Sequence, residues 1–389
     1  MKRIYFDYAS TTPTDPAVIK AMEPYFFEQF GNPSSPHTLG REANKVLEES
    51  RERVAKFLGA AAEEIIFNSG GSEGNNHAVL GIAHALREKG QHIIVSAVEH
   101  HSLLEPAAFL RDQGCKITYL PVDAMGRVNP QDVKKAITPE TILIAVMHAS
   151  NEIGTIQPVE EIGRIAKESK IPFLVDAVQT VGHIPVNVNQ LGADFLSLSA
   201  HKFYGPKGVG ALYIRKGVKV NSFLRGGDQE RGRRASTQNV AGIVGLAKAL
   251  ELCQSIPPDN SWRAPRIQLE TEFQITLRNR LIEEIPKKIQ GVKVNGHLTE
   301  RLPNNAHFSF EKVEGEALLM SLDMQNIAAS MGSACTSGAM EPSHVLRAIG
   351  LSDELALGSL RLSIGRWTTQ EDIDYLLEKL PDIVASLRI

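Results

Sequence analysis

The chain has 389 residues, 42% hydrophobic and 22% charged, which predicts two domains or one large α/β unit with a sizeable core. Its 42 lysines and arginines nearly balance its 45 aspartates and glutamates, so we expect neither a nucleic-acid nor a membrane partner. No run reaches the ~18–20 apolar residues of a membrane span, and the start, MKRIYFDYAS, lacks the apolar centre of a signal peptide.

Short apolar runs alternate with amphipathic stretches from about residue 60 to 215. The expected strands cover 64–67, 92–97, 116–122, 141–148, 172–177, 194–199 and 210–215, and the expected helices cover 73–90, 102–114 and 159–170. Runs that are apolar on both faces and separated by helices predict a mostly parallel sheet covered on both sides. Ligands bind such sheets beyond the carboxyl ends of the strands, so the residues that follow strands are the candidates for a site.

A different pattern begins after the sheet region. The stretch 255–266 holds three prolines among polar residues and predicts a linker. A long amphipathic helix is expected at about 266–288, and the strands and helices after it predict an α+β unit. The sequence shows no internal repeat.

The stretch NSGGSEGNN (68–76) is a glycine-rich turn that opens a helix. Backbone N–H groups at a helix N-terminus, together with the Ser72 hydroxyl, can hold an anion such as phosphate. The turn matches neither GxGxxG nor GxxxxGK[ST], which disfavours dinucleotide and P-loop sites. A plain tight turn is the alternative.

Polar residues also follow the next strands. Asp176 and Gln179 come after the strand 172–177, although Asp176 fits an N-cap for the next helix equally well. Lys202 directly follows the strand 194–199. A lysine desolvated there has a lowered pKa and can form a Schiff base with a carbonyl; a solvated surface lysine is the alternative.

Several histidines lie close to these strand ends. His100 and His101 follow the strand 92–97, and each alone fits a capping or surface residue. With His148 and His201 they could form a zinc site, but no HExxH or CxxC pair supports one.

The three cysteines are of two kinds. Cys115, at a strand start, and Cys253, on an apolar helix, fit small buried residues. Cys335 lies in SMGSACTSGAMEPSH (330–344), whose small residues and lack of apolar periodicity predict an exposed, mobile loop. An exposed thiol is prone to oxidation, so its presence favours a reactive role. Because three cysteines build no disulfide framework, we expect a reducing, cytoplasmic compartment.

Together, an anion-binding turn, a strand-end aspartate, a strand-end lysine and a histidine beside them form the set that a pyridoxal-phosphate (PLP) enzyme needs. The sequence resembles the cysteine desulfurases of the NifS/IscS group, PLP enzymes with the aspartate-aminotransferase-like α/β fold. The resemblance runs from end to end and is most specific in SAHKFYGPKG (199–208) and GSACTSGAMEPSHVL (332–346).

The resemblance implies a fold with two domains. The larger would span residues 16–258 and contain a mostly parallel, seven-stranded type of sheet. The smaller α+β domain would combine residues 1–15 with 259–389 and carry the mobile cysteine loop at about 328–342. One departure from the pattern lies in RRASTQN, where Ser236 stands in place of a glycine found in many relatives.

The resemblance also implies roles for individual residues. Lys202 would be the Schiff-base lysine, Cys335 the nucleophile that accepts sulfur, and His100 a ring-stacking residue that also moves protons. The remaining cofactor contacts would come from Asp176 at the pyridine nitrogen, Gln179 at the ring oxygen, and Gly71, Ser72, Ser199, His201 and, from the other subunit of a homodimer, Thr237 at the phosphate. The substrate carboxylate would be bound by Arg361 and Asn151, with Asn32 in a substrate-side loop.

The implied activity is conversion of L-cysteine to L-alanine. Sulfur would pass to Cys335 as a persulfide and then to acceptors such as iron–sulfur cluster assembly proteins. Two alternatives are a selenocysteine lyase or cysteine β-lyase on the same fold, and a non-catalytic sulfur-trafficking protein. A β-lyase has no need of Cys335, whereas persulfide formation requires it.

Overall fold

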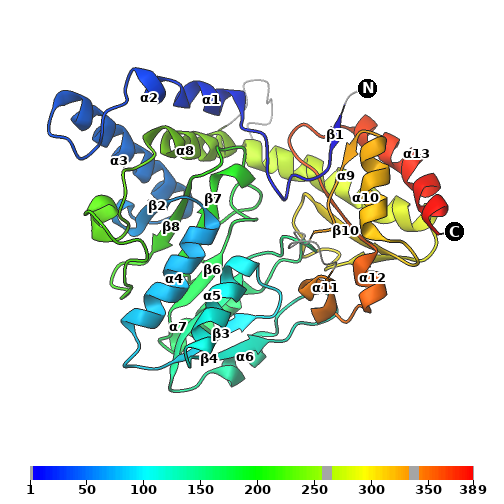
Figure 1. The fold of residues 1–389 in the computed structure, drawn as a ribbon, viewed down its shortest axis with the longest axis horizontal. Coiled ribbons are helices and arrows are strands. Elements are labelled where there is room, and N and C mark those ends of the chain that lie inside the picture. Colours follow the sequence, from blue (N-terminus) through cyan, green and yellow to red (C-terminus); the bar gives the residue numbers. More distant parts are fainter. Residues whose placement is uncertain (1–2, 256–264, 333–340, 389) are drawn as a thin grey trace.

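The computed structural model describes residues 3–255, 265–332 and 341–388. Cys335 and most of the predicted linker lie outside these ranges. Helices and strands alternate along the described chain (Figure 1). The helices are α1 (Pro16–Met22), α2 (Pro24–Phe27), α3 (Thr38–Leu58), α4 (Gly71–Ala85), α5 (His101–Asp112), α6 (Pro130–Ala136), α7 (Val159–Glu168), α8 (Val240–Gln254), α9 (Arg266–Lys288), α10 (Gly315–Met324), α11 (His344–Ala348), α12 (Asp353–Leu357) and α13 (Gln370–Leu387), with 3-10 turns at Ala62–Glu64, Ala200–Lys202 and Gln229–Gly232.

A seven-stranded sheet forms the centre of the larger part, in the order β2-β8-β7-β6-β5-β3-β4. Its strands are β2 (Ile65–Asn68), β3 (His92–Ser96), β4 (Lys116–Leu120), β5 (Thr141–Met147), β6 (Phe173–Asp176), β7 (Phe195–Ser199) and β8 (Gly210–Ile214). Strand β8 runs antiparallel to β2 and β7, and the other six strands all run in one direction. The expected mostly parallel α/β sheet is confirmed, with each strand within two residues of its predicted bounds.

Helices cover both faces of this sheet, because its strands are apolar on both sides. Side chains of α4 and α5 pack with Ile93 and Val95 on one face, where the two helices lie in front of the strands (Figure 1). Side chains of α3, α6, α7 and α8 pack with Ile94 on the other face. Within the described residues no helix is long and apolar enough to cross a membrane.

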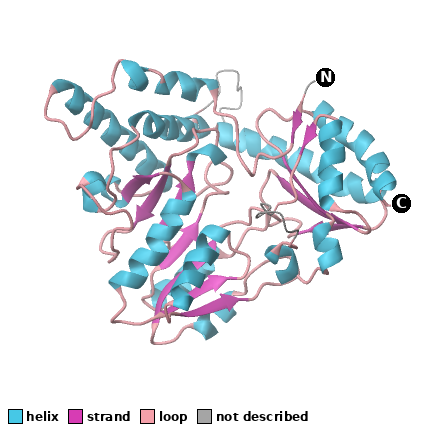
Figure 2. Ribbon diagram, viewed as in Figure 1, coloured by secondary structure: helices cyan, strands magenta, loops and turns pink. Residues whose placement is uncertain are grey.

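A second, smaller group of strands lies beside its own helices (Figure 2). An antiparallel sheet of β9 (Val292–Asn295), β10 (Asn305–Phe310) and β12 (Ser359–Ser363) shares a core with α9, α10 and α13. The N-terminal strand β1 (Ile4–Tyr5) pairs with β11 (Ile327–Ala328) in the same part. This pairing is what the assignment of residues 1–15 to the small domain requires; the domain boundaries themselves stay a prediction.

One buried ion pair ties the loop before α8 to the sheet. Arg51 of α3 contacts Glu230 through two hydrogen bonds of 2.6 and 3.0 Å, and both side chains are 2% exposed. Glu230 also accepts a hydrogen bond from the Phe67 amide of β2, at 2.9 Å. The pair therefore fixes the segment that leads to Ser236 and Thr237.

We expect Glu230→Gln to lower the free energy of unfolding by about 3–5 kcal/mol, because it removes the buried counter-charge of the Arg51 guanidinium. The carboxylate that stays beside Arg51 is that of Glu48, 3.0 Å from Nε and 38% exposed. Urea unfolding followed by circular dichroism measures the change. The matched control is Glu251→Gln, since Glu251 lies 3.5 Å from Arg53 in an exposed pair and such pairs contribute about 0–1 kcal/mol. Equal losses in the two variants would contradict this account.

Candidate active site

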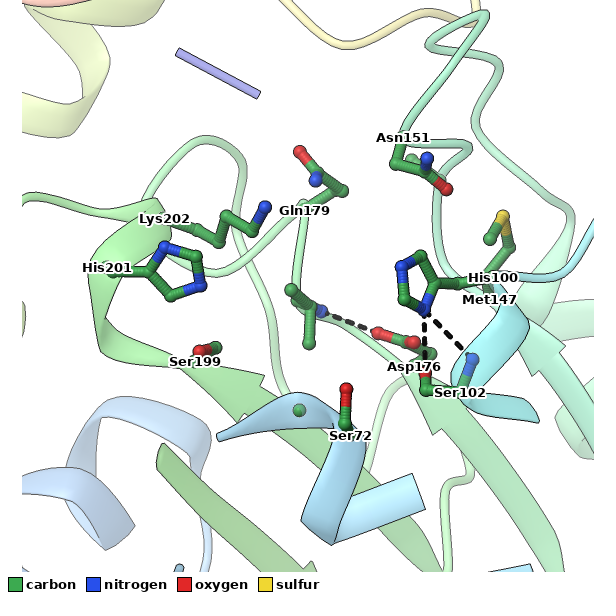
Figure 3. Close-up of a pocket in the computed structure, with 13 residues that line it drawn as sticks. Ser72, His100, Ser102, Met147, Asn151, Asp176, Gln179, Ser199, His201 and Lys202 are labelled. Atoms are coloured by element: carbon green, nitrogen blue, oxygen red, sulfur yellow. Dashed lines mark hydrogen bonds between the residues drawn. The ribbon is translucent and has the colours of Figure 1, made fainter. Parts of the chain in front are cut away.

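Four neighbouring strands of the large sheet end at one edge, in the order β7-β6-β5-β3. Because these strands are parallel, the residues that follow them come together. Lys202 follows β7, Asp176 ends β6, Asn151 follows β5 and His100 follows β3. They line one cavity of about 240 Å³ (Figure 3).

The cavity collects most of the residues predicted for the site. The predicted residues in its wall are Gly71, Ser72, His100, Asn151, Asp176, Gln179, Ser199, His201 and Lys202, and the others are Ser102, Met147, Ala149 and Val178. The structure brings these predicted residues together because β2, β3, β5, β6 and β7 all end at this edge; their roles stay a prediction.

One end of the cavity combines groups that can hold an anion. The helix α4 begins at Gly71, after Gly70 with a φ of +146°, a conformation that favours glycine. A Cβ on Gly70 would stand 3.2 Å from the Ser199 hydroxyl, so the backbone of the turn lies close to this side chain. The first N–H groups of a helix have no partner within it, and here they lie beside two serine hydroxyls and His201.

Asp176 is buried at the end of β6, and both of its carboxylate oxygens accept hydrogen bonds. Oδ1 accepts from the Val178 amide at 2.9 Å, and Oδ2 accepts from Asn75 Nδ2 at 2.7 Å. The contact with Val178 has the local geometry that a capping aspartate would make. Asp176 nevertheless lines the cavity. Its capping contact and its predicted role in the site are therefore compatible.

Lys202 points into the cavity and donates hydrogen bonds to the carbonyls of Ala9 and Ser10, at 2.6 and 2.8 Å. Burial, with a further contribution from the Arg361 charge, lowers the pKa of Lys202 from 10.5 to about 8. Lys202 is partly buried and lines the cavity, which disfavours the alternative of a solvated surface lysine. A lysine in this state is partly a neutral amine near pH 8, as a nucleophile or base requires.

We expect cyanate to carbamylate Lys202 of the PLP-free protein at a rate that rises with pH around a midpoint near 8, because only the neutral amine reacts and its fraction grows as pH passes the pKa. Peptide mass spectrometry of samples labelled at a series of pH values measures the midpoint. A lysine in an unstructured peptide, with its ordinary pKa of 10.5, is the control. A Lys202 midpoint above pH 10 would contradict the lowered pKa.

His100 lies at the opposite wall from Lys202 (Figure 3). It is the N-cap of α5, where its Nδ1 accepts a hydrogen bond from the Ser102 amide, so the capping interpretation holds together with the cavity position. Burial lowers the pKa of His100, and the nearby Asp176 opposes this effect. Among the described residues, no group of three or more His, Cys, Asp and Glu side chains is placed to hold a metal ion.

Arg361 is 3% exposed on β12 and lies next to the cavity wall rather than in it. Its Nη1 donates to the Asn151 carbonyl and its Nη2 to Asp7 Oδ1, each at 2.8 Å. Ser10 Oγ accepts a further bond from Nη2 at 2.8 Å. The predicted carboxylate-binding arginine is thus beside Asn151, and Asp7 holds it.

Three predicted site residues lie away from the cavity or outside the described ranges. Asn32 and Thr237 are exposed and do not line the cavity; the role predicted for Thr237 concerns another subunit. Cys335 lies outside the described residues. Next to Thr237, Ser236 has a φ of +88°, a region that favours glycine.

The other two cysteines differ from each other. Cys253 is buried as expected, and burial raises the pKa of its thiol to about 12. Cys115 is only partly buried, so the expectation of a buried residue is wrong in degree. Its Sγ lies 3.0 Å from the Gln91 carbonyl, to which it donates, at the sheet edge.

Some residues of the site have no predicted role. Asp7, Asn75 and Ser102 contact the predicted residues directly. The sequence holds only weak indications that two of them belong to the site. Asn75 lies one helical turn after Gly71, and Ser102 lies two residues after His100. Nothing in the sequence places Asp7 beside Arg361, 354 residues away.

Comparisons with known proteins agree with this geometry. The aminotransferase class-V family model matches residues 4–376. The chain is 54% identical to cysteine desulfurase IscS of Dictyoglomus turgidum over 389 residues, which cover 100% of this chain and 96% of that protein. It is 51% identical to cysteine desulfurase IscS of Methanosarcina thermophila over 387 residues, with coverages of 100% and 93%.

Solved structures give the same result. A NifS-like protein superposes with a TM-score of 0.90 at 37% identity, covering 99% of this chain and 100% of that chain. SspA in complex with cysteine superposes with a TM-score of 0.81 at 36% identity, with coverages of 95% and 100%. With its fold, its cavity and these relatives, the chain belongs to the class-V aminotransferase family and, within it, to the cysteine desulfurases.

Proposed function

We propose that this protein is a PLP-dependent cysteine desulfurase that converts L-cysteine to L-alanine and transfers the sulfur to Cys335. The observation that carries the proposal is the cavity in which Lys202, with its lowered pKa, lies among Asp176, His100 and the N-terminus of α4. A structure similar to this chain is that of SspA in complex with cysteine, which supports L-cysteine as the substrate.

The donor set of the cavity fits PLP. The turn at Gly70 and Gly71, with Ser72, Ser199 and His201, suits a phosphate group. Asp176 would pair with the pyridine nitrogen, Gln179 would approach the ring oxygen, and His100 would face the ring, while Lys202 would bond the aldehyde carbon. When bound, PLP supplies an aldehyde that joins to amines and a ring that accepts an electron pair.

The protein's own residues would then bind the substrate and move a proton. Arg361 and Asn151 would hold the substrate carboxylate. This carboxylate would take the place of Asp7 as the partner of the Arg361 guanidinium. Lys202 Nζ would accept the Cα proton, because its lowered pKa makes the neutral amine available.

Sulfur transfer needs a nucleophile. The Cys335 thiolate would attack the substrate sulfur, so that a sulfur–sulfur bond forms and the Cβ–sulfur bond breaks. The electron pair of the broken Cβ–sulfur bond stays on Cβ, which takes up a proton and becomes the alanine methyl group. The sum is L-cysteine plus a thiol giving L-alanine plus a persulfide, with no external oxidant.

The test supplies L-cysteine and dithiothreitol to the PLP-loaded protein and measures L-alanine, pyruvate and sulfide. We expect equal amounts of L-alanine and sulfide and no pyruvate. Pyruvate and ammonia in place of alanine would overturn the proposal in favour of a β-lyase, and no turnover of a PLP-loaded protein would favour a sulfur-trafficking protein. L-Selenocysteine in a parallel reaction tests the lyase alternative, which requires it to be the preferred substrate.

A homodimer is part of the same proposal. Four apolar side chains around α1 and α2 are exposed: Ile19, Phe26, Phe27 and Phe30, with Phe27 85% exposed. A monomer rarely leaves such a group in water, so burial against a second copy is supported. We further propose a sulfur acceptor such as an iron–sulfur cluster assembly protein and a cytoplasmic location, which the scarcity of cysteines supports.

A further inference from the structure

A chain of hydrogen bonds joins Asp176 to His100 beneath the cavity. Asn75 Nδ2 donates to Asp176 Oδ2 at 2.7 Å and to Ser102 Oγ at 2.9 Å. Ser102 Oγ in turn lies 2.8 Å from His100 Nδ1, and the Ser102 amide donates to the same nitrogen at 3.1 Å. Figure 3 shows both bonds from Ser102 meeting one ring nitrogen of His100.

The packing of α4 explains why Asn75 reaches both side chains. Gly74 lets this helix lie directly on β7, because a Cβ there would stand only 2.8 Å from Ser197 Oγ. Asn75, the next residue, is fully buried between the end of β6 and the start of α5. Its Oδ1 has no hydrogen-bond partner among the described residues, so the amide is devoted to the two bonds that Nδ2 donates.

The directions of these bonds follow from what each group can do. Both oxygens of Asp176 accept hydrogen bonds, so the Asn75 amide must turn its NH2 group toward this carboxylate. The same NH2 group donates to Ser102 Oγ, whose own O–H is left to donate to His100. The Ser102 backbone N–H can only donate. His100 Nδ1 therefore carries no proton, and its one lone pair is shared between the Ser102 N–H and the Ser102 O–H.

We propose that Asn75 and Ser102 are positioning residues that hold His100 as a neutral ring with its proton on Nε2, and that the same Asn75 amide fixes the Asp176 carboxylate. The inference deepens the proposed function, on which it rests for the identity of the reaction. Figure 3 shows the other ring nitrogen of His100 turned toward the cavity. His100 thus offers a bound ligand an N–H donor, a known use of neutral imidazole, rather than a free base.

The charges around His100 do not reverse this assignment. The titratable groups that face it are Asp176, Lys202, His101 and His344, of which only Asp176 favours the imidazolium. Burial opposes the imidazolium most strongly. A proton on Nδ1 would also face the Ser102 backbone N–H, which can only donate. The neutral form is therefore supported by the geometry at Ser102, and the desolvation of the ring by its neighbours acts in the same direction.

The test measures the tautomer and the pKa of His100 by nitrogen-15 NMR of the PLP-loaded protein labelled at histidine. His100→Gln identifies the signals. We expect an unprotonated Nδ1 and a protonated Nε2 in the unmodified protein. Loss of the Ser102 hydroxyl in Ser102→Ala removes a bond that favours the neutral ring, and should raise the pKa of His100 by about 0.5–1 pH unit. Ser102→Thr, which keeps the hydroxyl, should restore the original value.

Asn75→Ala adds a second readout. The Asp176 carboxylate loses one donor, so the dissociation constant of PLP, measured by absorbance titration, should rise about 10-fold. The matched control is Asn76→Ala, since the side-chain amide of Asn76 donates to the backbone carbonyls of Ser72 and Ser102 rather than to the side chain of Asp176 or His100. If Asn75→Ala fails to fold, the two Ser102 variants decide the question.

A proton on Nδ1 in the unmodified protein, or an unchanged His100 pKa in Ser102→Ala, would overturn the inference. Equal PLP affinities in the Asn75 and Asn76 variants would overturn the part that concerns Asp176. These readouts need no turnover of L-cysteine. The inference can therefore be overturned in a protein that is a desulfurase, and supported in a protein that is not.

Discussion

Replacing Cys335 by alanine should abolish L-alanine formation from L-cysteine while PLP binding stays unchanged. The side chain is the proposed acceptor of sulfur, and none of the groups that line the cavity is a second thiol. We expect the rate to fall by at least about 10³-fold, as for loss of a nucleophile. Alanine and sulfide are measured under the conditions used for the unmodified protein.

Cys115→Ala is the matched control, because Cys115 is a partly exposed thiol on β4's side of the sheet and outside the cavity. It should keep its full activity. Turnover of L-cysteine by Cys335→Ala at the original rate would contradict the desulfurase mechanism and favour a β-lyase.

Replacing Lys202 by alanine should remove both the covalent attachment of PLP and the base that accepts the Cα proton. We expect activity to fall by at least about 10⁴-fold, since both functions depend on one amine. The yellow absorbance of the protein should be bleached or shifted at the same time. Absorbance spectra and alanine assays measure the two effects.

Lys207→Ala is the control for Lys202→Ala. Lys207 lies five positions further along the chain and is exposed outside the cavity. This variant should retain both absorbance and activity. Full activity of Lys202→Ala, with an unchanged spectrum, would contradict the role given to the lysine.

Much of the large sheet could be predicted from the sequence because its strands are short apolar runs bounded by polar turns. Strand β5 (Thr141–Met147), buried throughout, and the expected run at 141–148 differ by one residue. The antiparallel direction of β8 (Gly210–Ile214) could not be predicted. An apolar run has the same pattern whichever way the strand runs. The direction of β8 depends instead on how the segment around Lys202 and Tyr204 connects it to β7. Helix α4 also begins earlier than expected, because Gly71 itself adopts helical geometry after Gly70.

The site could be predicted where a residue's position depends on a strand end. Lys202, Asp176 and Asn151 are examples, since parallel strands bring their carboxyl ends together whatever lies between them. Asn75 and Ser102 could not be predicted in the same way. Their contact depends on how closely α4 packs on β7, which Gly74 permits but which no local pattern reveals.

Arg361 shows a further limit. A bidentate guanidinium suits the substrate carboxylate, and the resemblance pointed to this residue. Its pairing with Asp7, however, arises because the N-terminal segment crosses to β12, where Asp7 bridges Ser363. Only the three-dimensional fold joins two residues so far apart in the chain.

The persulfide on Cys335 is the central claim, and one measurement tests it directly. The PLP-loaded protein is mixed with one equivalent of L-cysteine in the absence of reductant, trapped with an alkylating reagent, digested and analysed by peptide mass spectrometry. The account predicts that the peptide containing Cys335 gains one sulfur atom, in an amount equal to the L-alanine released. Release of alanine or pyruvate with free sulfide, while Cys335 gains no sulfur at any stage, would contradict it.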